Sequence, residues 1–114
     1  MASRQVVLEA TVAPVTGTKV STLCPLAGKI VQIMFNFPDG CNGLVDAQFY
    51  RNGPPQTWLA PEKANTFLSM NNVFIPFIAD EPVGHGEELW LIVDNHDAVA
   101  THTITVVATV IGEE

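Results

Sequence analysis

The stretch LWLIVDNHDAVATHTITVVATVI, residues Leu89 to Ile111, contains two segments in which every second residue is apolar. In the first segment the apolar set is Leu89, Leu91 and Val93, and in the second the same period runs from Ile104 to Val110. A period of two residues is typical of β-strands that bury one face. The polar residues between the segments indicate a loop, so this stretch predicts two strands of a β-rich fold.

The rest of the chain repeats this alternation, and no segment shows the period of an amphipathic helix. Further strands are predicted in QVVLEATV (Gln5–Val12), TKVSTL (Thr18–Leu23), KIVQIMFNF (Lys29–Phe37), LVDAQFYR (Leu44–Arg51), VFIPFIA (Val73–Ala79) and, more briefly, Thr66–Ser69. We expect an all-β fold, a single antiparallel β-sandwich of seven to eight strands and of jelly-roll or Greek-key type. It would span residues 1–114, with residues 1–5 as a flexible N-terminal arm.

Turn residues and prolines suggest how these strands are connected. The turn-rich stretch PDGCNG, residues 38–43, would join a hairpin in which Phe35 lies opposite Ala47 and shares its core face with Val31. Pro76 assigns its strand to a sheet edge, because proline cannot donate a hydrogen bond to a neighbouring strand. The polar segment 80–88 is predicted to be a loop.

The side chains with the most chemical character lie in the loop of the opening stretch. A hairpin of the last two strands would place Asn95 opposite His102 at the rim of the core, where the two could hydrogen-bond as a structural pair. The alternative is a metal site built from His96, His102 and Asp97, with Asp94 as a further ligand. Asp94 has the opposite strand parity to His102, so only a tight loop would bring them together. We therefore predict a structural role for Asn95 and His102, with no metal and no other cofactor.

The composition restricts the class of partner. With 5 Lys and Arg against 12 Asp and Glu, the net charge is −7, which argues against nucleic acid and against an anionic membrane surface. Charged residues make up 15% of the chain, compared with about 25% in ordinary soluble domains. Hydrophobic residues reach 47%, more than a small sandwich can bury. We expect a face covered by another copy, in a homo-oligomer for which a trimer is one option. The alternative, that Thr, Asn and Gln supply the missing polarity, stays open.

No sequence motif indicates catalysis. None of the three serines lies in a G-x-S-x-G nucleophile elbow, so we expect a protein that is not an enzyme. Cys24 and Cys41 form no CxxC pair and are predicted to be buried free thiols, with a disulfide as the alternative outside a cell. The N-terminus alternates instead of forming a signal peptide, which suggests synthesis inside a cell.

One valine and several aromatic and proline residues are the candidates for contact with a partner. The positions selected are Val7, Tyr50, Pro54, Pro55, Trp58 and Trp90. Tyr50 and Trp90 fall on strand faces opposite the main core, and Trp58 lies in a proline-rich middle segment. We expect Tyr50 and Trp90 to be covered by a neighbouring subunit, and Trp58 to close one end of the sandwich. An exposed aromatic row could instead stack on sugar rings, so a carbohydrate-binding module is the alternative hypothesis.

Two stretches, FNFPDGCNGLVDAQFYRNGPPQ and LWLIVDNHDAVATHTITVVATV, resemble small β-sandwich proteins encoded among the structural genes of tailed bacteriophages and related viruses. The matching positions are Phe37 to Cys41, Gly43 to Val45, Asn95 with Asp97, and His102 to Val110. The resemblance implies a virion component, made in the host cytoplasm, that decorates or cements a capsid by binding the major capsid protein. It implies no active-site residues, and a minor capsid or tail-associated subunit is a further option.

Overall fold

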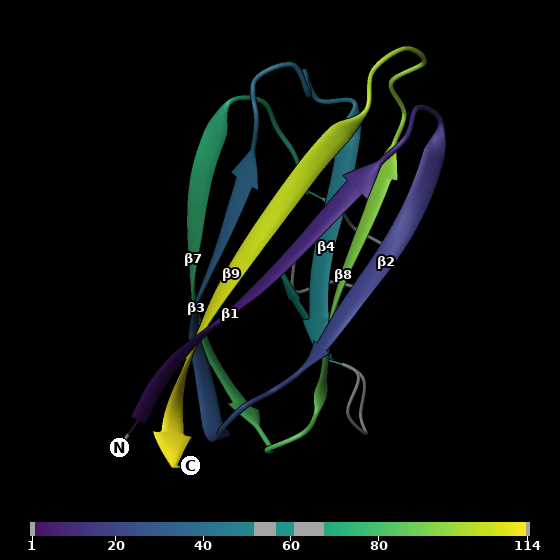
Figure 1. The fold of residues 1–114 in the computed structure, drawn as a ribbon. Helices are drawn as coiled ribbons and strands as arrows, with labels where there is room; N and C mark the ends of the chain where they lie inside the picture. Colours follow the sequence, from purple (N-terminus) through teal and green to yellow (C-terminus); the bar gives the residue numbers. More distant parts are fainter. Residues whose placement is uncertain (1, 52–56, 61–67, 114) are drawn as a thin grey trace.

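Two facing β-sheets make up the protein (Figure 1). The structure, a computed structural model, describes residues 2–51, 57–60 and 68–113, with the backbone alone for residues 57, 58, 60 and 113. The strands are β1 (Ala2–Val12), β2 (Thr16–Leu23), β3 (Ala27–Phe37), β4 (Val45–Arg51), β5 (Thr57–Ala60), β6 (Leu68–Ser69), β7 (Val73–Val83), β8 (Glu88–Asn95) and β9 (His102–Glu113). Among these residues no helix has the length and apolarity needed to cross a membrane.

The strand order is that of a jelly roll. Sheet 1 has the order β1-β9-β3-β7, and sheet 2 has the order β2-β8-β4-β5, with the two-residue strand β6 also beside β4. The antiparallel pairs are nested, because β1 pairs with β9, β2 with β8, β3 with β7, and β4 with β5 and β6. A chain that folds as one long hairpin and wraps across two sheets in this way is a jelly roll. The predicted all-β sandwich is confirmed, and this order decides between the two expected types.

Both predicted local hairpins are wrong, because in each of them the two consecutive strands lie in different sheets. Strand β3 pairs with β7 and β9, so Phe35 lies opposite Val106 and not opposite Ala47. Strand β8 pairs with β2 and β4, so Asn95 does not lie opposite His102. A period of two residues determines which face of a strand is buried, but it does not determine the strand's neighbour.

The predicted core faces are buried with one exception. Both sheets contribute, through Val6, Leu8, Ala10, Val12, Ile33, Phe35, Phe37, Val45, Ala47, Phe49, Leu89, Leu91, Val93, Ile104, Val106, Ala108 and Val110. The exception is Val31, which is only partly buried, while its neighbour Ile30 is fully buried. The pairing register shifts between Ile30 and Gln32, so a β-bulge reverses the side-chain direction on one side of it.

Two strands are longer than the sequence pattern suggests. Residues 2–5, expected to form an arm, pair with β9 from Gln5 opposite Thr109 to Ala2 opposite Gly112, because β9 is long enough to provide partners. Strand β7 lies at the edge of sheet 1, where Pro76 was expected. It continues through part of the predicted loop 80–88, because pairing with β3 extends as far as Val83.

Candidate functional site

Four connections meet at one end of the sandwich, the upper end in Figure 1, which we call the loop end. They are residues 13–15, 38–44, 70–72 and 96–101. Backbone hydrogen bonds join them: Val15 N donates to Asp97 O at 3.1 Å, and His96 N donates to Leu44 O at 2.8 Å. The connections of the loop end therefore hold one another in place.

Asn95, the last residue of β8, is the centre of this arrangement. Its side chain is 2% exposed, and Nδ2 lies 3.0 Å from Val12 O, 3.3 Å from Ala13 O and 2.9 Å from Ala100 O. Its Oδ1 accepts a hydrogen bond from Asp97 N at 2.9 Å. These contacts occupy both the donor and the acceptor side of the amide. Its partners are backbone groups of neighbouring connections, and not His102 as the predicted hairpin required.

His102, the first residue of β9, links two further side chains. It is 8% exposed, and its Nε2 lies 2.9 Å from Asp97 Oδ2. Its Nδ1 lies 3.8 Å from the Sγ atom of Cys41, in the connection between β3 and β4. We call Cys41, Asn95, Asp97 and His102 the loop-end hub.

The pKa shifts of Asp97 and Cys41 indicate which of these two side chains carries a proton. The hydrogen bond with His102 lowers the pKa of Asp97, and two backbone N–H groups of the same connection lower it further. Burial raises the pKa of Cys41, and the charges of Asp39 and Asp97 act in the same direction. Cys41 therefore keeps its proton at neutral pH, and the ionised Asp97 can only accept a hydrogen bond, so His102 Nε2–H donates to it.

A thiol, an imidazole and a carboxylate in this order also occur in cysteine hydrolases. A nucleophilic cysteine requires a lowered pKa and access to its substrate. Cys41 has neither, because it is 0% exposed and its pKa is raised. The geometry of the hub supports the fastening of connections and gives no support to a reaction at this thiol.

The alternative metal site is not assembled. His96 points to the outer side of sheet 2, where its Nε2 lies 3.0 Å from Asp46 Oδ2, whereas His102 and Asp97 meet inside the loop end. The candidate ligands are thus divided between two places. The part of the chain that the structure describes contains no group of three His, Cys, Asp or Glu side chains that could hold a metal ion.

The opposite end of the sandwich is closed by an ion cluster. Arg51 on β4 reaches from sheet 2 to Glu81 on β7 of sheet 1, with Nη2 2.9 Å from Oε1, and its Nη1 lies 2.8 Å from Glu87 Oε2. The three side chains are 12%, 21% and 28% exposed. Burial opposes the ionisation of Glu87, but hydrogen bonds from Arg51 and from the Gly84 N–H outweigh it and lower the pKa of Glu87.

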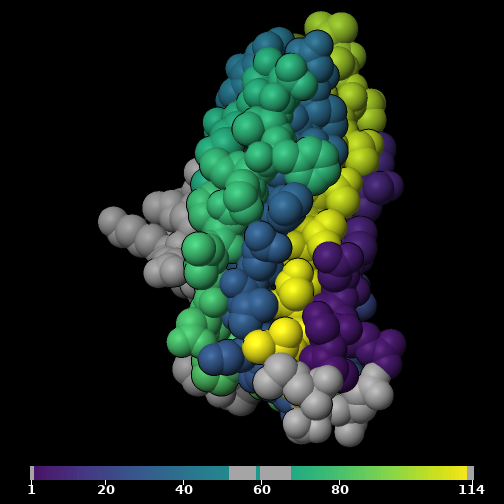
Figure 2. All heavy atoms as spheres, turned by 90° about the vertical axis from the view of Figure 1, so that its left-hand side faces the viewer, coloured from purple at the N-terminus to yellow at the C-terminus, as the bar shows by residue number. Residues whose placement is uncertain are grey.

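The outer face of sheet 1 is nearly free of charge. Figure 2 looks onto this face, with β7 in green, β3 in blue, β9 in yellow and β1 in purple. The strand registers align Val7, Val107, Met34 and Pro76 in one row across all four strands, which we call the central row. The neighbouring rows end on β7 in two large exposed apolar side chains, Phe74 at 63% and Ile78 at 91% exposed. Val7, a predicted partner contact, is 58% exposed in the central row.

The aromatic candidates lie on sheet 2. Tyr50 and Trp90 stack with ring centroids 6.4 Å apart and planes 10° apart. Tyr50 is only 5% exposed, so it is not available for the partner contact that we expected, because the chain itself already buries it. Trp90 is partly buried, and its Nε1 is a buried donor without a hydrogen-bond partner. Pro54, Pro55 and the Trp58 side chain lie outside the described residues.

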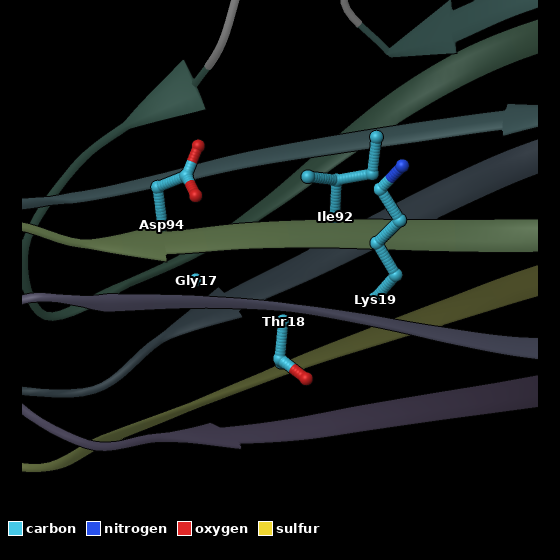
Figure 3. A pocket seen from close by; sticks show the side chains of 5 residues that line it. All are labelled: Gly17, Thr18, Lys19, Ile92 and Asp94. Carbon is cyan, nitrogen blue, oxygen red and sulfur yellow. The ribbon is translucent and has the colours of Figure 1, made fainter.

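An open depression of about 460 Å³ lies on β2 and β8 (Figure 3). Lys19, Ile92 and Asp94 stand on one side of the sheet, and Thr18 points to the other side. Gly17 makes room for the Asp94 carboxylate, because a Cβ atom at residue 17 would collide with it. A ligand site usually has several polar groups that converge on the ligand, whereas this depression offers one ammonium and one carboxylate. We therefore assign no ligand to it.

No protein-family model matches the chain, and no curated protein matches it in sequence. The solved structures provide neighbours in fold. The crystal structure of the Yersinia pseudotuberculosis-derived mitogen superposes with a TM-score of 0.51 at 12% identity, covering 99% of this chain and 91% of that one. The crystal structure of FlhE gives a TM-score of 0.49 at 5% identity, covering 96% and 98%. At these identities the likeness of the mitogen concerns the fold alone.

Proposed function

We propose that this chain is a non-enzymatic structural protein of a virus particle, which self-associates and decorates or cements the shell by binding the major capsid protein. It would be made in the host cytoplasm and reside on the capsid surface. The observation that carries the proposal is the nearly uncharged outer face of sheet 1. Jelly rolls are frequent in viral capsid domains, but they also occur in lectins and enzymes, so the fold gives only general support.

The charge distribution favours a second copy as the occupant of this face. Two chains of net charge −7 repel each other unless their contact avoids charged groups. The charged side chains described on this face are Glu9, Lys29 and Asp80, and the last two form an ion pair with Nζ and Oδ1 3.2 Å apart. Depletion of charge with apolar residues at the centre is typical of the cores of homodimer interfaces.

The size of the face is sufficient for such a contact. Four strands about 4.8 Å apart, each contributing nine residues at about 3.3 Å per residue, cover about 600 Å². Two copies packed face to face would remove about 1,200 Å² from water, the lower limit of the standard range for specific interfaces.

Lysine substitutions in the central row test the self-association. Val7→Lys and Met34→Lys would each place a desolvated ammonium in the contact, and the matched control Ser21→Lys adds the same charge to an exposed position on the outer face of sheet 2. In sedimentation equilibrium we expect an oligomer for the wild type and for Ser21→Lys, and dissociation for both central-row variants. A wild type that remains a monomer at high concentration would contradict the proposal.

The location in a virus particle requires a separate measurement. Mass spectrometry of purified particles from the source virus should detect the chain at a copy number close to that of the major capsid protein. A much lower copy number would indicate the alternative, a minor capsid or tail-associated subunit. Absence from the particles would exclude a virion role.

The carbohydrate-binding alternative has less support. It requires an exposed aromatic platform, whereas Tyr50 is buried and stacked on Trp90. A glycan array probed with the wild type and with Trp90→Ala tests it directly. Strong binding that depends on Trp90 would favour this alternative.

A further inference from the structure

Three large apolar side chains are exposed on neighbouring connections of the loop end. Val15 is 71% exposed, Leu44 is 41% exposed and Val99 is 87% exposed. The backbone N–H of Val15 donates to Asp97 O, and the carbonyl of Leu44 accepts from His96 N. Both hydrogen bonds reach the connection that carries Val99, so the three side chains belong to connections that are bonded to one another. We call them the apolar tip.

The backbone of Val15 is strained. Its φ of 56° lies in the left-handed region, where a β-branched residue is a rare outlier. Asparagine tolerates this conformation, and the loop end uses it at Asn42 and Asn72, where φ is 48°. The stability of the folded chain would therefore be higher with another residue at position 15, such as asparagine. An exposed valine in a strained conformation indicates a contact that the isolated chain does not make.

The apolar tip is held rigidly. The Asp97 carboxylate accepts hydrogen bonds from Val99 N at 2.9 Å and from Ala100 N at 3.2 Å, and its other oxygen is bound to His102. Asn95 fixes the connection that carries Val15 through the carbonyl of Ala13. Side chains on fixed connections lose little conformational entropy when a partner binds, which favours affinity.

The surroundings of the apolar tip are acidic. None of the four connections contains a lysine or an arginine. The carboxylates at this end belong to Asp39, Asp46, Asp94 and Asp97. Asp46 and Asp97 are each bonded to a histidine, and charge complementarity with the remaining carboxylates favours a partner whose contact surface carries positive charge. A second copy of this chain has net charge −7, and an anionic membrane has the wrong sign.

We propose that the apolar tip inserts into a shallow apolar pocket of a different protein, and that lysine or arginine side chains surround this pocket. The contact uses the loop end and is separate from self-association through sheet 1. If the chain decorates a virus shell, the shell protein would provide the pocket. The docking inference does not depend on that role and can be tested without it.

A library of random peptides displayed on yeast provides the probe. Selection uses the wild-type chain, with counter-selection against the double variant Val15→Asn/Val99→Asn, which removes two of the three side chains of the apolar tip and keeps the charge. We expect the selected peptides to combine large apolar residues with lysine or arginine. In fluorescence anisotropy the dissociation constant of the best peptide should rise by about tenfold or more for the double variant, since two anchor side chains are lost.

The matched control is Ile78→Asn, which removes an equally exposed apolar side chain from β7 and should leave peptide affinity unchanged. The inference would be overturned if no peptide is enriched, if the selected peptides lack basic residues, or if they bind the double variant equally well.

Two other outcomes would identify a different occupant. Binding of the apolar tip to phosphatidylcholine vesicles would replace the docking inference with a membrane contact. A change in the oligomer of the double variant would indicate a second copy, whereas loss of the oligomer in Val7→Lys alone concerns sheet 1 and leaves the docking inference standing.

Discussion

The two ends of the sandwich are fastened by different kinds of interaction. At the loop end, the buried amide of Asn95 binds backbone groups of several connections, and His102 joins Asp97 to Cys41. At the opposite end, Arg51 connects the two sheets through an ion cluster with two glutamates. One end therefore depends on buried, directional hydrogen bonds, and the other depends on charges that remain partly in contact with water.

This difference bears on function. Polar groups of the loop-end hub are satisfied within the chain, and the connections that they fasten also carry exposed apolar side chains. The opposite end carries the ion cluster, and among the described residues beside it Leu23, 63% exposed, is the large exposed apolar side chain. A rigid apolar surface is suited to binding a partner, whereas partly hydrated ion pairs contribute solubility and moderate stability.

The largest effect is expected for Asn95→Ala. The substitution leaves three carbonyl oxygens and the Asp97 N–H without their partner, at a position that is 2% exposed. We expect the free energy of unfolding to fall by about 3 kcal/mol, since each unsatisfied buried group costs about 1 kcal/mol or more. Urea unfolding followed by tryptophan fluorescence measures it. His96→Ala, at the next position but exposed, is the control and should change stability by less than about 0.5 kcal/mol.

Arg51→Met should have the next largest effect, at the opposite end. It leaves Glu81 and Glu87 close together without the cation. We expect the free energy of unfolding to fall by about 2 kcal/mol, below the range for fully buried pairs because the glutamates retain some water contact.

The two ends should also differ in how salt changes these effects. Raising the salt concentration should reduce the effect of Arg51→Met and leave the effect of Asn95→Ala unchanged. Equal salt dependence of the two variants would show that the ends are not distinct in this way.

The sequence predicts the core faces of this fold well and the strand pairing poorly. From Ile104 to Val110 the alternation is regular, and every predicted inward residue is buried. The same pattern is compatible with many neighbours, and it could not show that β8 and β9 lie in different sheets. The bulge near Val31 also leaves no trace in the pattern, because both Ile30 and Val31 are apolar.

The loop-end hub could be predicted only in part, since its contacts are distant in sequence. Asn95, Asp97 and His102 stand out as polar residues beside apolar strands, and they do lie together. Cys41 is 61 positions away from His102, and only the jelly-roll order brings the two connections together. The left-handed conformation of Val15 contradicts its own residue preference, so no sequence rule points to it.

Asp97→Asn tests how much the loop end contributes to the loss of stability in acid. The pKa of Asp97 is lowered in the folded chain, so its contribution is fully present above the unfolded pKa of about 3.9 and is lost as pH falls through the folded pKa. The variant should therefore be less stable than the wild type at pH 7, and it should lose less stability as pH falls from 5 through the unfolded pKa and below it. Thermal unfolding across this range measures it. The exposed Asp39→Asn is the control, and an unchanged acid dependence in Asp97→Asn would show that the hub does not titrate as described.

The smallest effect, opposite in sign, is expected for Val15→Asn. Asparagine adopts the left-handed conformation more easily than a β-branched residue, whose strain there is about 1 to 2 kcal/mol. Val15 is 71% exposed, so removing its apolar side chain costs little, and we expect a gain of about 1 kcal/mol in the free energy of unfolding. The control Val99→Asn changes a similar exposed valine outside the positive-φ positions and should be neutral to within about 0.5 kcal/mol.

These two valine variants connect stability with binding. If Val15→Asn stabilises the fold and also weakens peptide binding, then the strain at Val15 is maintained for the partner and not for the fold. If it destabilises the chain, the conformation of Val15 is supported by contacts within the loop end, and the argument from strain to a partner loses its basis. The same substitution thus decides whether the loop end is held in place for its own stability or for the surface that it presents.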